Sequence, residues 1–84
     1  MIIGAAVIGY DGVVVWLPPP ARHHTIMRHM VDDLKHPIPI NGKQGFIDNE
    51  IGFVDRIRAA ACAINCGQID KLNWPPYLYS EDLW

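Results

Sequence analysis

Three basic side chains follow a run of three prolines, in the segment Arg22-His23-His24. A guanidinium can donate two parallel hydrogen bonds to a phosphate, and imidazoles beside it can join according to their protonation state. The apolar pattern that begins here predicts a helix, so these side chains would lie at its N-terminus, where free amides favour anions. Phosphate binding is therefore the chemistry that this group suits. The alternative is that His23 packs or caps, because it projects over the side of Met27.

A second group lies in the stretch 44–67, where Phe46 and Phe53 bracket a polar turn ahead of Asp55 and Arg56. Asp55 is a favoured N-cap residue, and Arg56 stands where its donors could meet a phosphate. Aromatic rings beside cationic donors suit a nucleotide, which is held by base stacking and phosphate contact. The alternative is that Asp55 only caps a helix, Arg56 is solvated and both Phe rings are core.

Catalysis would require a general base such as His23 or His24 with an acidic partner. The acids available for this are Asp32, Asp33, Glu50 and Asp55. The chain has no recognisable nucleophile turn, no phosphate-cradling glycine loop and no paired-carboxylate motif. We therefore expect a binding protein rather than an enzyme.

Metal binding would use Cys62 and Cys66 with two of the histidines. Those histidines are His23, His24, His29 and His36. A Cys-x3-Cys spacing inside a helix with scattered histidines matches no standard closed zinc site. We expect reduced thiols, no metal and no cofactor.

The 84 residues allow a single domain, 1–84, in which half of the residues are hydrophobic and 19% are charged. A chain this short has a small core, so the apolar surplus suggests self-association. The net charge of −2 gives no electrostatic footprint for DNA or an acidic membrane. Small anions remain suitable partners.

The first segment, 1–17, is interpreted as a hairpin rather than a signal or membrane segment, because it lacks a basic leader and is too short to span a bilayer. Apolar residues on both alternating faces predict a strand over 2–10 that is covered on two sides. Asp11-Gly12 indicates a two-residue turn, and the returning strand is expected over 13–17.

Apolar residues at three- and four-residue spacing predict a helix from about Arg22 or His23 to Lys35, ended by His36-Pro37. Asn41-Gly42 indicates a turn into a strand over 44–47. A second helix follows Asp55 and ends at Gly67, and the aromatic tail is expected to pack against the domain or a neighbour. The fold class is therefore α+β: a small antiparallel sheet with two helices, oligomeric.

An ordered set of motifs resembles a known family. The motifs are the His-His segment, Gly45-Phe46, Phe53-Val54-Asp55-Arg56, Cys66-Gly67-Gln68-Ile69 and the ending Leu78-Tyr79-Ser80-Glu81-Asp82-Leu83-Trp84. In this order they resemble the first described family of phage Thoeris anti-defence proteins, over nearly the whole chain from Arg22. That family consists of small oligomeric proteins that sequester cyclic ADP-ribose-type immune signals without cutting them.

The resemblance implies roles for matching positions. Phe46 would stack on adenine, Asp55 would read a polar edge and Arg22 would contact phosphate. Lys71 stands where the family places an Arg near the pyrophosphate, and it offers a point charge in place of a fork.

The resemblance also implies how the protein would act as a whole. We expect a homo-oligomer, a dimer or hexamer, in the cytoplasm of an infected bacterial host, with cyclic oligonucleotides as a second ligand class. The alternatives are a small phosphodiesterase-like enzyme that uses His23 or His24, and a module that blocks a protein partner with its aromatic tail.

Overall fold

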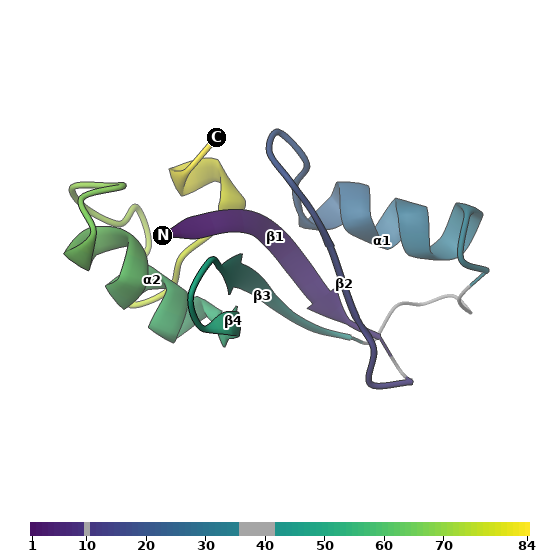
Figure 1. Cartoon of the computed structure of the whole chain (residues 1–84). Helices are drawn as coiled ribbons and strands as arrows, with labels where there is room; N and C mark the ends of the chain where they lie inside the picture. The colour runs from purple at the N-terminus through teal and green to yellow at the C-terminus, as the bar shows by residue number, and fades with distance from the viewer. Residues whose placement is uncertain (10, 36–41) are drawn as a thin grey trace.

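The computed structural model describes residues 1–9, 11–35 and 42–84, so His36 to Asn41 of the expected helix end and turn lie outside it. Figure 1 shows the elements in chain order: β1 (Ile2–Ile8), β2 (Val14–Leu17), α1 (His23–Asp32), β3 (Lys43–Asp48), β4 (Gly52–Asp55), α2 (Arg56–Asn65) and the 3-10 turn η1 (Ser80–Asp82). The expected α+β class with a small antiparallel sheet and two helices is confirmed.

The sheet has four antiparallel strands in the order β2-β1-β3-β4. β1 is central and largely buried, as its apolar residues on both faces predict. β4 was not expected, because the sequence suggested that Phe53 leads directly into a helix. Instead Val54 lies opposite Phe46 in the ladder and β4 forms the edge. Four residues are too few to show a strand periodicity in the sequence.

The hairpin between β1 and β2 is confirmed, but its expected two-residue turn is wrong. The closing hydrogen bond runs from Gly9 N–H to Val13 O (3.0 Å), and Gly12 N–H donates back to Gly9 O (3.0 Å). Gly12 has a φ of +81°, in the left-handed region that favours glycine. The Asp11 carboxylate accepts from Val13 N–H at 3.1 Å. In a two-residue turn this N–H would instead donate to a main-chain oxygen of the opposite strand.

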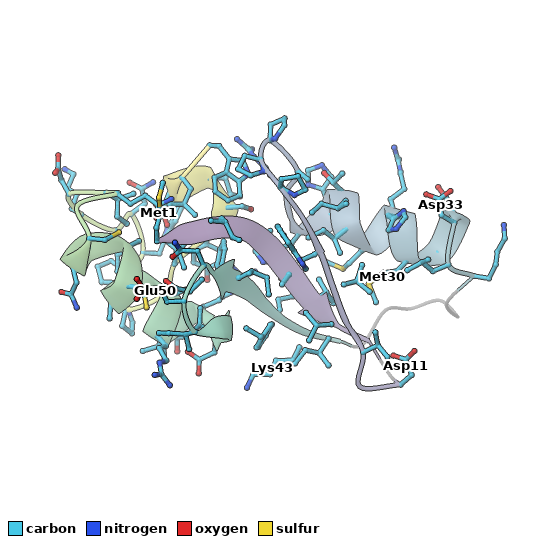
Figure 2. All side chains as sticks on the ribbon, in the orientation of Figure 1. Met1, Asp11, Met30, Asp33, Lys43 and Glu50 are labelled. Atoms are coloured by element: carbon cyan, nitrogen blue, oxygen red, sulfur yellow. The ribbon has the colours of Figure 1, made fainter. Side chains whose placement is uncertain are left out.

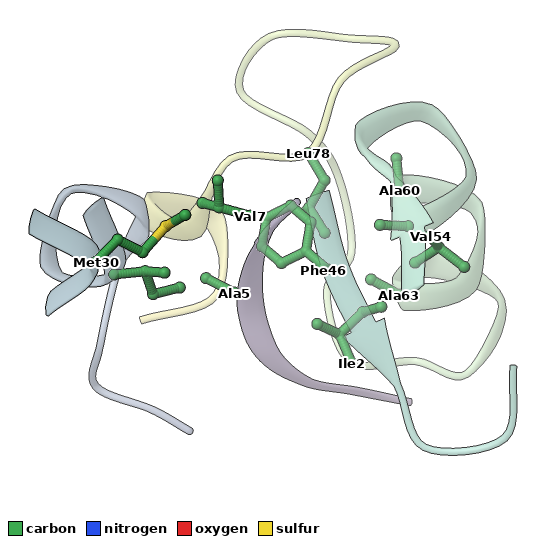
Figure 3. Close-up of a cluster of buried hydrophobic side chains, with 11 residues drawn as sticks. Ile2, Ala5, Val7, Met30, Phe46, Val54, Ala60, Ala63 and Leu78 are labelled. Atoms are coloured by element: carbon green, nitrogen blue, oxygen red, sulfur yellow. The ribbon is translucent and has the colours of Figure 1, made fainter. Parts of the chain in front are cut away.

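Both helices contribute to one core on a single face of the sheet. Ala5 and Val7 of β1 and Phe46 of β3 face Ile26 and Met30 of α1 and the alanines of α2. Figure 3 shows Phe46 in the middle of this cluster. The small side chains of α2 that lie in it, Ala59, Ala60 and Ala63, are buried, so the helix can approach the sheet closely.

The opposite face of the sheet, here called the outer face, carries small residues under two large rings. A Cβ on Gly45 would lie 2.5 Å from Cζ of Phe53, and one on Gly4 would lie 2.6 Å from Cε3 of Trp16. Glycine is therefore required for these rings to lie flat on the strands. Trp16 remains 41% exposed and Val14 38% exposed, so the outer face presents apolar surface.

Helix α1 ends three residues before the expected Lys35. Asp33 N–H and Leu34 N–H both donate to His29 O, at 2.9 and 3.2 Å, and Lys35 has a left-handed φ of 60°. Leu34 follows the buried Met30 by four residues, a helical spacing, but it is 45% exposed. The helix thus ends where the apolar side chains on one side of it no longer contact the core.

Helix α2 begins and ends as predicted. The Asp55 carboxylate accepts from Arg58 N–H at 2.8 Å, which is an N-cap bond. Gly67 follows the helix with a φ of +77°, the left-handed conformation that closes helices. Neither α1 nor α2, with ten residues each, is long and apolar enough to cross a membrane.

The C-terminal segment, residues 77–84, packs against the domain, as one of the two expectations for it stated. Leu78 is fully buried and its N–H donates to Arg56 O at 3.1 Å. Trp84 donates through Nε1 to Ala21 O at 2.9 Å. Figure 1 shows this segment, in yellow, between the two helices. It is hydrogen-bonded to the first residue of α2 through Leu78 and to Ala21 and Arg22, just before α1, through Trp84.

The first residues of the chain are held at the α2 end, where Figure 2 labels Met1 and Glu50. The Met1 ammonium lies 2.9 Å from the Asp48 carboxylate. This contact and the N–H groups of Glu50 and Ile51 lower the pKa of Asp48 to about 2. Gln68 exchanges two hydrogen bonds of 2.9 Å with the main chain of Ile2, so this motif residue anchors the strand.

Candidate functional site

A hollow of about 460 Å³ lies where the N-termini of α1 and α2 meet the C-terminal segment. We call it the cationic hollow. It is lined by Arg22, His23, His24, Gln44, Arg56, Tyr79, Ser80 and Glu81. Two helix N-termini and two guanidinium groups therefore surround one space, which favours an anion.

Arg22 and His24 come from the beginning of α1. Arg22 is the N-cap residue and has the extended backbone usual at this position. Its N–H donates to Thr25 Oγ1 at 3.2 Å. Its side chain donates through Nη2 to the main-chain oxygen of Trp84, so the guanidinium is turned toward the C-terminal segment. His24 is exposed at the hollow, where its ring is accessible to a ligand.

Arg56 is the first residue of α2 and is fixed by three contacts. Nη1 donates to Leu78 O at 2.8 Å, Nη2 donates to Gln44 Oε1, and Cζ lies 4.7 Å from the centre of the Tyr79 ring. Partial burial lowers the pKa of Arg56. The expectation of a merely solvated Arg56 does not hold, because both of its hydrogen-bond partners are neutral and its charge is partly desolvated.

The charge of the hollow is not balanced by ion pairs. In the described part of the chain, the only ion pairs are Met1–Asp48 and His29–Asp33, and neither involves Arg22 or Arg56. Glu81 also lines the hollow and offsets one of the two positive charges. Two arginines and one acidic side chain therefore line the hollow, in a chain whose net charge is −2.

His23 is a buried link between three segments rather than a ligand-facing group. Gly45 O can only accept, so Nε2 of His23 donates to it (2.7 Å) and Nδ1 accepts from the Ser80 hydroxyl (3.3 Å). Burial lowers the pKa of His23, partly opposed by the bond to Gly45, so the ring is neutral at pH 7. The packing alternative for His23 is thus confirmed.

Phe46 does not offer a stacking surface. Its side chain is fully buried, and its ring meets the edge of His23 at 4.9 Å and an interplanar angle of 89°. The expectation that Phe46 stacks on adenine is therefore wrong in this structure, and the core alternative holds. The reason is that both helices and Leu78 pack over the face of the sheet that carries Phe46.

Two further expected site residues lie away from the hollow. Asp55 is exposed and uses its carboxylate to cap α2, and Lys71 is exposed in the loop after α2. Neither lines the hollow. Of the seven expected residues, the structure brings together Arg22, His23, His24 and Arg56.

Four lining residues were not singled out from the sequence: Gln44, Tyr79, Ser80 and Glu81. Gln44 had a usable signal, because it lies two residues before Phe46 and so shares the core-facing side of β3. A polar residue at a core-facing position indicates a specific partner, here Arg56. The other three belong to the ending of the chain, and only its packing shows that they reach the hollow.

The two cysteines are free thiols. The described residues contain no group of three or more His, Cys, Asp or Glu side chains placed to hold a metal ion. His29 is paired with Asp33 at 2.7 Å, and His36 lies outside the described residues.

The chain is a small α+β domain in which two helix N-termini and the C-terminal segment surround a hollow lined by two arginines. The family model described as Phage T4 y16D protein matches residues 1–84. The chain therefore belongs to this family of bacteriophage proteins. No match was found among the curated proteins or the solved structures.

Proposed function

We propose that this phage protein binds and sequesters a phosphorylated signalling nucleotide of the cyclic ADP-ribose type in the cationic hollow, without cleaving it. The single observation that supports this most is that Arg22 and His24 line one hollow with Arg56, which lies far from them in the sequence. Its volume of about 460 Å³ falls within the range of small-molecule sites. The proposed setting is an infected bacterial cytoplasm, where the protein would withdraw an immune signal.

Calorimetric titration with cyclic ADP-ribose tests the proposal. Arg22→Ala should weaken binding by about 1–3 kcal/mol, the contribution of a hydrogen bond to a charged group, which is roughly 5- to 150-fold in Kd. Arg28→Ala is the matched control, since Arg28 lies on the exposed side of α1 and outside the lining. Equal affinities of the wild type and of Arg22→Ala would contradict the proposal.

The alternative of a phosphodiesterase-like enzyme rests on His24. His23 has both ring nitrogens engaged, whereas His24 is exposed at the hollow. Incubation with cyclic ADP-ribose, heat denaturation and chromatography separate the two functions. A sequestering protein returns the intact nucleotide, and an enzyme returns cleavage products that disappear in His24→Ala.

Homo-oligomerisation, as a dimer or hexamer, is part of the proposal. The outer face supports it, because Trp16 and Val14 leave apolar surface exposed there, and exposed apolar patches of this kind mark contacts. Light scattering of the wild type and of Trp16→Ser measures whether the oligomer depends on this face.

Cyclic oligonucleotides are proposed as a second ligand class. A chain that binds neither class would favour the module that blocks a protein partner.

A further inference from the structure

A second hollow, of about 220 Å³, adjoins the first and is lined by Trp74, Tyr79 and Glu81. We call it the aromatic hollow. Tyr79 and Glu81 also line the cationic hollow, so the two spaces meet at these side chains. A ligand with an anionic part and a flat part can therefore occupy both.

Trp74 presents an indole ring that is exposed but held in place. It is 59% exposed, which is unusual for a ring of this size. Two prolines separate it from Tyr77, and Tyr77 N–H donates to Trp74 O at 3.0 Å, so a closed turn fixes its backbone. Its ring meets the edge of Tyr79 at 5.6 Å and 81°.

Tyr79 connects this exposed ring to the guanidinium of the first hollow. One contact is with Trp74, and the other is the Arg56 guanidinium 4.7 Å from the Tyr79 ring centre. The rings of Trp74 and Tyr79 and the Arg56 guanidinium therefore contact one another in this order. This is the order in which a nucleotide presents its base and its phosphate.

Glu81 supplies an acceptor at the same place. Its side chain is exposed, and among the hydrogen bonds of the described residues none is accepted by its carboxylate. A carboxylate next to two arginines stabilises their charge but opposes the binding of a phosphate, and its oxygens can accept hydrogen bonds from another part of a ligand. An exocyclic amino group of a nucleobase is a donor that a carboxylate accepts.

We propose that the aromatic hollow is a nucleobase subsite: the base stacks on Trp74, and its exocyclic amino group donates to Glu81. The subsite takes amino-bearing bases, such as adenine, in nucleotides whose phosphate lies between Arg22 and Arg56. The inference rests on the proposed phosphate site. It assigns to Trp74 the stacking role that the buried Phe46 cannot perform.

Titration of the wild type with inorganic pyrophosphate, AMP and IMP tests the subsite. AMP and IMP differ at purine position 6, where an amino group is replaced by a carbonyl that a carboxylate repels. The wild type should bind AMP at least tenfold more tightly than IMP. Trp74→Ala should weaken AMP binding roughly 5- to 150-fold, as loss of one stacked base does, and leave pyrophosphate binding unchanged. Trp74→Phe should restore most of the AMP affinity.

Glu81→Ala gives two changes of opposite sign, which a merely structural role would not produce. Pyrophosphate affinity should rise, because a negative charge next to the arginines is removed. The preference for AMP over IMP should disappear. Glu50→Ala removes one exposed negative charge elsewhere and should change neither value.

The inference and the proposed function fail in different ways. If Trp74→Ala keeps full AMP affinity, or if AMP and IMP bind equally, the base subsite is overturned while pyrophosphate binding that depends on Arg22 still supports the phosphate site. If Trp74→Ala changes only the oligomeric mass, Trp74 belongs to a subunit contact and the subsite is again overturned. If the wild type binds neither pyrophosphate nor AMP, both proposals are overturned.

Discussion

Arg56→Lys should loosen the attachment of the C-terminal segment while it leaves the positive charge of the hollow in place. The guanidinium donates to Leu78 O at 2.8 Å and to Gln44 Oε1, and it lies over Tyr79 at 4.7 Å. A lysine ammonium can satisfy one of these acceptors, but it cannot reproduce the planar fork or the stacking.

The expected loss follows from these contacts. A hydrogen bond from a charged donor contributes about 1.5–3 kcal/mol, and the lower end applies to this half-buried group. The lost cation–π contact adds about 0.5 kcal/mol. The free energy of unfolding should therefore fall by about 2 kcal/mol, which corresponds to a decrease in Tm of roughly 8–16 °C for a domain of this size.

Urea unfolding followed by tryptophan fluorescence measures this change. With a urea m-value of about 1 kcal/mol/M, the midpoint should fall by about 2 M. Arg58→Lys is the matched control, because Arg58 lies in the same turn of α2 but is exposed, and it should change stability by less than about 0.5 kcal/mol. Superimposable curves for Arg56→Lys and Arg58→Lys would refute the assigned role of the guanidinium.

The remaining predictions concern the core, a helix cap and two titrating groups. Phe46→Leu should lower stability by about 1–2 kcal/mol and leave pyrophosphate affinity unchanged, whereas loss of affinity alone in calorimetry would restore a ligand role. Asp55→Ala should cost about 1 kcal/mol in chemical unfolding, and Asp55→Asn much less; equal losses would contradict the cap. The lowered pKa of His23 means that its contribution to the free energy of unfolding is complete above about pH 6.5 and is lost as the pH falls through its folded-state pKa. In thermal scans at several pH values, His23→Gln should therefore lack this fall in Tm. The pKa of Asp48 is about 2 against an ordinary 3.8, so its contribution to the free energy of unfolding is complete above about pH 4 and is lost toward pH 2. Acid unfolding of Asp48→Asn should therefore depend less on pH over this range.

The sequence predicted those elements whose signals are local. The two-faced apolar run of β1, the N-cap at Asp55 and the left-handed Gly67 each depend on a few neighbouring residues, and all three are present. β4 and the early end of α1 depend on pairing and on contact with the core. Phe53 and Leu34 have sequence patterns that suit more than one structure, and only tertiary contacts decide between them.

The site was predicted in part for the same reason. Arg22, His24 and Arg56 were expected from the chemistry of their side chains and from their places at helix starts. The family resemblance implied a stacking role for Phe46, but the sequence does not show that the Phe46 ring is buried and that the Trp74 ring is exposed. Side-chain chemistry is visible in a sequence, but exposure is a property of the packed chain.

The same residues hold the C-terminal segment and line the hollow, and this does not prevent an anion from binding. A guanidinium has five N–H donors, and Arg56 uses two nitrogens for Leu78 O and Gln44 Oε1. Donors therefore remain for a phosphate while the segment stays docked. Both acceptors are neutral, and Glu81 is the one acidic side chain in the lining, so an incoming phosphate would add negative charge beside the partly desolvated Arg56. The proposed binding would then be favoured because it offsets part of the desolvation cost of Arg56, even in a chain whose net charge is −2.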